Sequence, residues 1–140
     1  MFNNLSLRNP SSWTMFIFGV LAFFLGLVGI IQPEITLQLT GIDPIEQAQR
    51  ATGDATTAFV IASSMASFNM GVYYMLAALS NWQAFYRWTV PFRMVTFCVF
   101  MLAVAREIAP SGFVGVALWE LIGALLTGAA LWYESRRNIE

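Results

Sequence analysis

The chain has 140 residues, of which 58% are apolar, 15% are aromatic and only 11% are charged. A soluble globular domain carries about 25% charged residues because its surface faces water, so this composition predicts a single-domain integral membrane protein. The net charge of −1 and the lack of a basic patch exclude nucleic acid as a partner.

Missing residue types exclude most catalytic chemistry. The chain has no histidine, which rules out bis-imidazole haem ligation, the usual zinc and di-iron sites, and a Ser-His-Asp nucleophile. Cys98 is the only cysteine, so disulfide exchange within the chain is excluded as well. No phosphate-binding glycine loop is present. The sequence therefore predicts no cofactor and no metal site, and it favours a non-enzymatic protein over an enzyme without excluding an enzyme.

The first apolar run covers residues 15–31 and predicts a helix over 13–32. Twenty helical residues span roughly 30 Å, the thickness of the hydrocarbon layer. Ser11 or Ser12 is a suitable N-cap, and Pro33 follows the end of the run. Because no small-x-small cleavage site follows the run, we interpret it as a retained anchor rather than a signal peptide.

The connection over residues 33–55 is the longest, and we expect it to fold back as a small helical lid on the exoplasmic surface. Its first part predicts a short helix that begins at Pro33 and stops at Gly41, although residues 35–39 also alternate as in a strand.

The second part of this connection resembles a capping box, with Asp43 as the cap, Pro44 at the first helical position and Glu46 after it. It predicts a helix over 44–52 that Gly53 closes. Asp54 is then a candidate cap for the next helix.

Three further apolar segments predict helices over 56–79, 88–107 and 113–133. Their short connections make neighbouring helices antiparallel. Pro91 is expected in a first helical turn, where its missing N–H costs little. The predicted fold is all-α: an integral membrane antiparallel four-helix bundle in one domain, residues 1–140, with a short helical lid.

The distribution of arginine predicts the orientation in the membrane. One side of the predicted topology carries Arg8, Arg87, Arg136 and Arg137, and the opposite side carries Arg50 and Arg106 together with most of the acidic residues. By the positive-inside rule both termini are cytoplasmic, and we expect a bacterial inner (plasma) membrane protein.

Glu120 is the strongest single polar signal, because a carboxylate inside a membrane helix costs about 2.5–3.5 kcal/mol on insertion scales. It shares a helix face with Gly123, Ala124 and Thr127, so we expect it to point into the bundle. The functional interpretation is a proton or cation site. The structural interpretation is a neutral carboxyl or an ion pair that joins helices.

Two arginines are candidate partners for Glu120. Arg106 lies about five residues shallower, a distance that the two side chains can close together. Arg93 is estimated to be about 12 Å away and is expected to extend toward the cytoplasmic headgroups instead. The sequence therefore favours Arg106 as the partner.

Other polar residues at the depth of Glu120 lie on the second predicted helix. Ser63 and Ser67 form a small-residue row with Gly71, and we interpret the serines mainly as packing and back-bonding residues. Asn69 points away from this row and is expected to face another helix or another protomer, since a buried amide needs several partners.

In layout, the chain resembles small four-helix bacterial membrane proteins of the BphX-like and DoxX-like kind. The residues that carry this resemblance are the glycine-rich first helix ending at Pro33, the turn Leu39-Thr40-Gly41-Ile42, and the pair Trp119-Glu120. The resemblance implies a fold rather than a function.

Three functions follow as hypotheses. The first is a small non-enzymatic accessory, assembly or structural subunit that acts through helix–helix contacts with a membrane protein partner or in a homodimer. The second is a small dimeric proton-coupled transporter using Glu120. The third is a membrane enzyme or a binder of a lipid or quinone.

Overall fold

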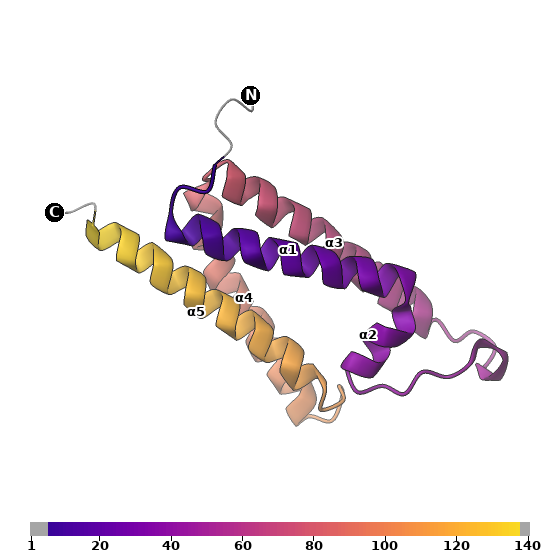
Figure 1. Cartoon of the computed structure of the whole chain (residues 1–140). Coiled ribbons are helices and arrows are strands. Elements are labelled where there is room, and N and C mark those ends of the chain that lie inside the picture. The colour runs from indigo at the N-terminus through magenta and orange to yellow at the C-terminus, as the bar shows by residue number, and fades with distance from the viewer. Residues whose placement is uncertain (1–5, 138–140) are drawn as a thin grey trace.

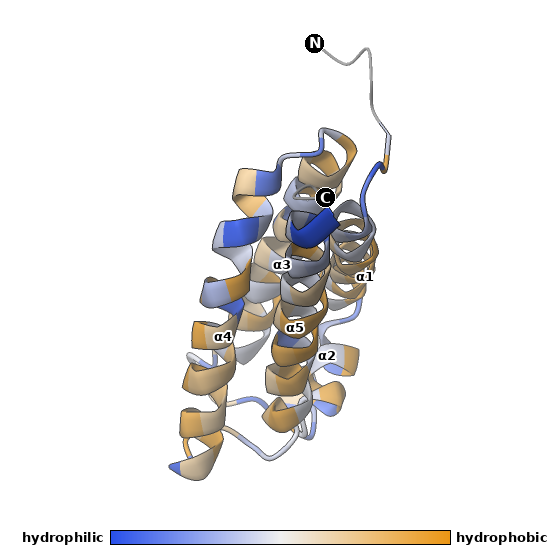
Figure 2. Ribbon diagram, turned by 90° about the vertical axis from the view of Figure 1, so that its left-hand side faces the viewer, coloured by the Kyte–Doolittle hydropathy of each residue, from blue (hydrophilic) through white to orange (hydrophobic). Residues whose placement is uncertain are grey.

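The computed structural model describes residues 6–137, apart from the side chain of Gln47. Within this range it is all-helical and contains no strand: α1 (Pro10–Ile31), α2 (Pro33–Leu39), a 3-10 turn (Gln47–Gln49), α3 (Thr56–Leu79), α4 (Gln83–Ala105) and α5 (Phe113–Arg137). The four helices α1, α3, α4 and α5 are long and apolar enough to cross a membrane. Apolar residues cover most of their length (Figure 2).

Helices α1 and α3 form a closely packed antiparallel pair (Figure 1). Glycines allow the approach, because a Cβ on Gly19 or Gly71 would meet the backbone of the other helix, and one on Gly26 would meet the backbone at Phe68. Gly29 lies against the side chain of Ser64 in the same way. The glycines of α1 therefore serve contact with another helix of the same chain.

Helices α4 and α5 form the second antiparallel pair, with Phe100 and Phe113 packing edge to face at 5.8 Å between ring centroids. Contacts between α1 and α5 join the two pairs. In contrast, α3 and α4 contact each other mainly near their connecting turn, where Tyr74 packs on Phe85. The two pairs diverge from this end of the molecule toward α2 (Figure 1).

A hydrogen-bonded network closes the end where α1 begins and α5 finishes, which we call the terminal end. The amide and the hydroxyl of Ser11 both donate to the carboxylate of Glu134. The hydroxyl of Ser12 donates to Asn81, and the hydroxyl of Tyr86 donates to the carbonyl of Ala77. This terminal-end network joins α1, α5, the turn between α3 and α4, and the start of α4.

Three helices end in the same motif, with a residue in the left-handed region just after the helix. The residues are Gly41 after α2, Asn81 after α3 and Glu107 after α4, with φ of 81°, 51° and 58°. In each case the next residue's amide bonds back to the helix, as Trp82 does to Ala77. These are Schellman caps, and they allow the chain to reverse in few residues.

Helix α2 lies at the opposite, wider end of the molecule (Figure 1). Residues 33–39 form a helix and not a strand, and Gly41 stops it, as the helical alternative predicted. The turn after α2 touches the turn before α5, since a Cβ on Gly112 would collide with the backbone of Thr40. Helix α2 therefore connects the two diverging helix pairs.

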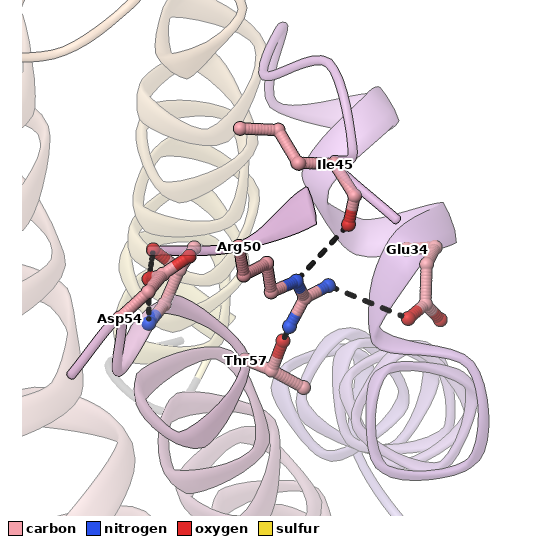
Figure 3. Close-up of polar contacts among 6 residues, drawn as sticks. Glu34, Ile45, Arg50, Asp54 and Thr57 are labelled. Atoms are coloured by element: carbon pink, nitrogen blue, oxygen red, sulfur yellow. Dashed lines mark hydrogen bonds and ion pairs between the residues drawn. The ribbon is translucent and has the colours of Figure 1, made fainter. Parts of the chain in front are cut away.

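The capping-box prediction for residues 44–52 is wrong, because this stretch holds only the short 3-10 turn at Gln47–Gln49. The side chain of Arg50 explains the difference. It donates to the carbonyl of Ile45 at 3.0 Å, hydrogen-bonds to Thr57 and lies 3.9 Å from Glu34 (Figure 3). These contacts attach the connection to α2 and α3 in an irregular conformation.

Two predicted helix starts are also corrected. The N-cap of α1 is Asn9, and Ser11 and Ser12 are buried inside the first turn, where they serve the terminal-end network. Helix α4 begins at Gln83 rather than near residue 88, so Pro91 lies inside it. The tight turn after α3 leaves only residues 80–82 between the two helices, and α4 starts as soon as the chain has reversed.

Candidate functional site

Arg93 is a buried cation in the middle of α4. Its side chain is only 4% exposed. The guanidinium carbon lies 4.3 Å from the ring centroid of Phe18 in α1 and 4.8 Å from that of Tyr74 in α3. Arginine stays charged in proteins, and aromatic faces are a favourable place for a desolvated guanidinium. Three helices thus enclose one permanent positive charge.

Glu120 of α5 supplies the opposite charge. Its Oε2 lies 3.7 Å from Nε of Arg93, and its side chain is 23% exposed. Gly123, one helical turn further along α5, makes room for the guanidinium, because a Cβ there would collide with it. A buried ion pair of this kind is costly to break, since the charge left behind has no partner.

The pair leaves hydrogen-bonding capacity unused. Nε and Nη1 of Arg93 have no hydrogen-bond partner among the residues that the structure describes. At 3.7 Å the carboxylate of Glu120 neutralises the charge without accepting a hydrogen bond, which requires about 2.7–3.2 Å. Buried donors without acceptors are uncommon in proteins, which sets this ion pair apart from the other polar contacts of the described residues.

A groove of about 430 Å³ lies over this ion pair where α3 and α4 diverge. Arg93 and Glu120 line it together with aromatic side chains from both helices, which are Tyr74, Phe85, Trp88 and Phe92. This volume lies within the range of sites for small organic molecules. The arrangement combines an apolar aromatic cleft with one polar point, and we treat it as the candidate functional site.

The predicted pairing of Glu120 with Arg106 is wrong. Arg106 is the exposed C-cap residue of α4 and lies outside the groove. The prediction placed the helix start near residue 88 and Arg93 near the membrane edge. Because α4 begins at Gln83, Arg93 lies about 15 Å into the helix rather than near its start. It turns inward to the carboxylate instead.

The other candidate residues lie apart from the ion pair. Ser63 donates to the carbonyl of Val60 in its own helix, as the packing interpretation predicted. Ser67 instead donates across the helix pair to the carbonyl of Ala22 in α1. The Thr127 hydroxyl is buried 3.2 Å from that of Thr14, so it joins α5 to α1. None of the three lines the groove.

Asn69 is half-buried on α3 and also lies outside the groove. Within residues 6–137, the side-chain hydrogen bonds of α3 involve Thr56, Thr57, Ser63 and Ser67, and none involves Asn69. Whether Asn69 faces another helix or another protomer therefore stays a prediction.

A second, more polar cavity of about 580 Å³ surrounds Arg50 at the α2 end. Three carboxylates line it, those of Glu34, Glu46 and Asp54. Hydrogen bonds from the hydroxyl and the amide of Thr56 hold the pKa of Asp54 below its ordinary value. Asp54 thus accepts a hydrogen bond from the amide of Thr56, the first residue of α3. The N-cap position itself is occupied by Ala55. Nε and Nη1 of Arg50 both have hydrogen-bond partners here, in contrast to the same two atoms of Arg93.

The sequence pointed to Glu120 but not to Arg93 as its partner, nor to the rings of Phe18 and Tyr74 that pack on Arg93. It also did not point to Glu134 of the terminal-end network. One signal for Arg93 was available. Gly123 lies on the same face of α5 as Glu120, and a small residue beside a membrane carboxylate leaves room for a long partner. Nothing in the apolar runs singled out Phe18 or Tyr74.

Within residues 6–137, no three His, Cys, Asp or Glu side chains come together as metal ligands. No protein-family model, no curated protein and no solved structure matches the chain.

Proposed function

We propose that the chain is an integral membrane protein that spans the bilayer with α1, α3, α4 and α5 and has both termini in the cytoplasm. In support, the terminal end carries Arg8, Arg87, Arg136 and Arg137, whereas the α2 end carries most acidic residues of the connections. The positive-inside rule places the arginine-rich end in the cytoplasm.

This topology is tested with reporter fusions in a bacterial host. A reporter inserted after Asn81 or fused after residue 140 should be active as a cytoplasmic reporter, and one inserted at Gly41 should be active only as an exoplasmic reporter. An exoplasmic C-terminus would contradict the orientation.

We further propose that the protein is a non-enzymatic accessory subunit that binds a transmembrane helix of another membrane protein through the outer face of α3. The observation that carries this proposal is an exposed row of small residues, Ala58, Ala62 and Ala66, spaced four apart on the side of α3 that α1 leaves uncovered. Asn69 lies on the same face. Small residues let helix backbones approach closely in lipid, and an amide there gains from a hydrogen bond across the interface.

The ion pair favours this role over that of a proton carrier. If Glu120 took up a proton, Arg93 would keep an uncompensated charge among apolar side chains. The transporter alternative therefore requires a second group that neutralises Arg93, and α1 and α3 carry no acidic residue that could do so.

The accessory role is tested by site-specific photo-crosslinking in intact membranes. A photoreactive residue at position 62 should form a protein adduct of defined mass. The same residue at position 125 of α5, where Leu125 is equally lipid-facing, should not. Ala62→Leu, which blocks close approach without touching α1, should abolish capture by a crosslinker at position 58.

The outcomes of this experiment distinguish between a different partner protein, a homodimer and no interface on α3. Mass spectrometry of the adduct identifies the partner protein. An adduct of twice the chain mass would show that the partner is a second copy of the chain, and it would contradict the proposal of a different membrane protein. Equal labelling at positions 62 and 125, or labelling of lipid alone, would refute the α3 interface.

A further inference from the structure

The groove between α3 and α4 is a distinct feature from the outer face of α3. Its walls are mainly apolar rings, and two of them, Trp88 and Phe92, are mostly exposed although they stand beside a buried charge. Because α3 and α4 pack together only near their turn, the groove opens sideways between two helices. A molecule dissolved in the membrane reaches such an opening by lateral diffusion, without crossing the aqueous phase.

The inner end of the groove provides hydrogen-bond donors. Arg93 lines the groove, its side chain is more than nine-tenths buried, and two of its three nitrogen atoms have no acceptor in the described chain. These donors belong to the arginine that lines the inner end of the groove. An unsatisfied buried donor is destabilising, most of all in a charged group, so binding of an acceptor recovers that free energy.

The charges at this end limit the kind of molecule that fits. Arg93 and Glu120 sum to zero, and the helices α1 and α3 that face them contain no Arg, Lys, Asp or Glu. An anionic headgroup would leave a net negative charge in an apolar surrounding, and a cationic one would leave a net positive charge. A neutral acceptor, such as a carbonyl oxygen, keeps the balance.

The walls favour a flat molecule. One cleft is lined by four aromatic side chains, Tyr74, Phe85, Trp88 and Phe92, and aromatic rings pack on one another more favourably than their buried area alone accounts for. We propose that the groove binds a neutral membrane-soluble lipid whose head is a flat ring bearing carbonyl oxygens, which is the chemistry of a quinone. A ring carbonyl accepts from Arg93, and the tail leaves between α3 and α4 into the bilayer.

This site is separate from the proposed partner interface, so the two proposals can fail independently. The test uses the full chain purified in mild detergent and titrated with decylubiquinone, with the bound fraction counted by native mass spectrometry. The expected result is saturable binding of one molecule per chain. Oleate, an anion of comparable size, should bind more weakly, and decylbenzene, which has a ring without carbonyls, should also bind more weakly.

Variants with matched controls locate the site. Phe92→Ala removes a wall residue that is 66% exposed and should weaken decylubiquinone binding roughly three- to tenfold. Its control is Phe59→Ala on α3, outside the groove and 75% exposed, which should leave binding unchanged. Arg93→Gln should weaken binding more than tenfold, and Arg106→Gln should not change it.

If Arg93→Gln does not fold, the exposed Phe92 pair still decides the matter. Equal binding by the Phe92 and Phe59 variants, tighter binding of oleate than of decylubiquinone, equal binding of decylbenzene, or no saturable binding would overturn the proposal. In the last case the ion pair serves packing alone.

Discussion

Glu134 in the last turns of α5 accepts two hydrogen bonds from Ser11 in the first turn of α1, one from the backbone amide at 2.6 Å and one from the hydroxyl at 2.9 Å. The first amides of a helix lack partners within the helix, and they carry the positive end of its dipole. Asn9 at the N-cap makes no side-chain capping bond. The carboxylate of Glu134 therefore caps the start of α1, a role that usually belongs to the side chain of the N-cap residue.

Glu134→Ala should lower the free energy of unfolding by about 1–2 kcal/mol, because it removes both acceptors from the start of α1. Glu134→Gln should lose less, since the amide oxygen still accepts one bond. Thermal unfolding in detergent measures the effect, with exposed Glu46→Ala as the control. Equal melting temperatures for the Glu134 and Glu46 variants would show that the contact contributes nothing.

The pair Arg93 and Glu120 predicts strong coupling in a double-mutant cycle. Arg93→Leu and Glu120→Leu should each destabilise by about 3–5 kcal/mol, because each leaves one buried charge uncompensated. The double variant should recover a large part of that loss. Replacing Arg106 with Leu in the Glu120→Leu background should bring no recovery. Additive losses for Arg93 and Glu120 would contradict the ion pair.

Gly123 and Gly115, both in α5, allow a matched comparison. Gly123→Ala places a Cβ against the guanidinium of Arg93 and the ring of Phe18, so it should destabilise by about 1–3 kcal/mol through overpacking. Gly115→Ala meets nothing within 4 Å and should stabilise by up to about 1 kcal/mol through helix propensity. The two melting temperatures should move in opposite directions. Two shifts of the same sign would argue against the close packing at Gly123.

Glu107 occupies a left-handed conformation, with φ of 58°, at the Schellman cap of α4. Glycine adopts this conformation without steric cost, whereas other residues lose about 1 kcal/mol or more. Glu107→Gly should therefore raise the melting temperature. The neighbouring Arg106→Gly, at a residue with negative φ, should lower it or leave it unchanged. A lower melting temperature for Glu107→Gly would mean that its carboxylate matters more than its backbone.

The number of long helices and their approximate extents could be read from the sequence, because uninterrupted apolar runs of this length leave few alternatives. Residues 56–79 match α3 at both ends. The irregular stretch around Arg50 could not be read in the same way. Its local pattern favours a helix, but contacts of one arginine with Ile45, Thr57 and Glu34 outweigh that preference.

Of the two charged residues of the candidate site, only Glu120 could be predicted from the sequence. A carboxyl within a predicted membrane helix identifies Glu120 whatever the fold, because the free-energy cost of inserting it into a bilayer follows from its depth along the helix. Its partner depends on where α4 starts and on how α4 and α5 are staggered. The predicted start of α4 was five residues too late, and Arg106 was predicted as the partner in place of Arg93. The rings of Phe18 and Tyr74 come from helices far apart in sequence, and only the packing brings them to the same guanidinium.

The tight turn at residues 80–82 has the geometry of a pivot, because α3 and α4 diverge from it. The terminal-end network fixes α3 and α4 beside this turn, and α4, about 35 Å long, extends from it as a lever arm. A rotation of about 5° there displaces the far end of α4 by roughly 3 Å. That far end leads directly into the turn where Gly112 touches Thr40. A slight widening of the groove near the pivot would therefore be amplified into a larger displacement near α2, at the opposite end of the molecule.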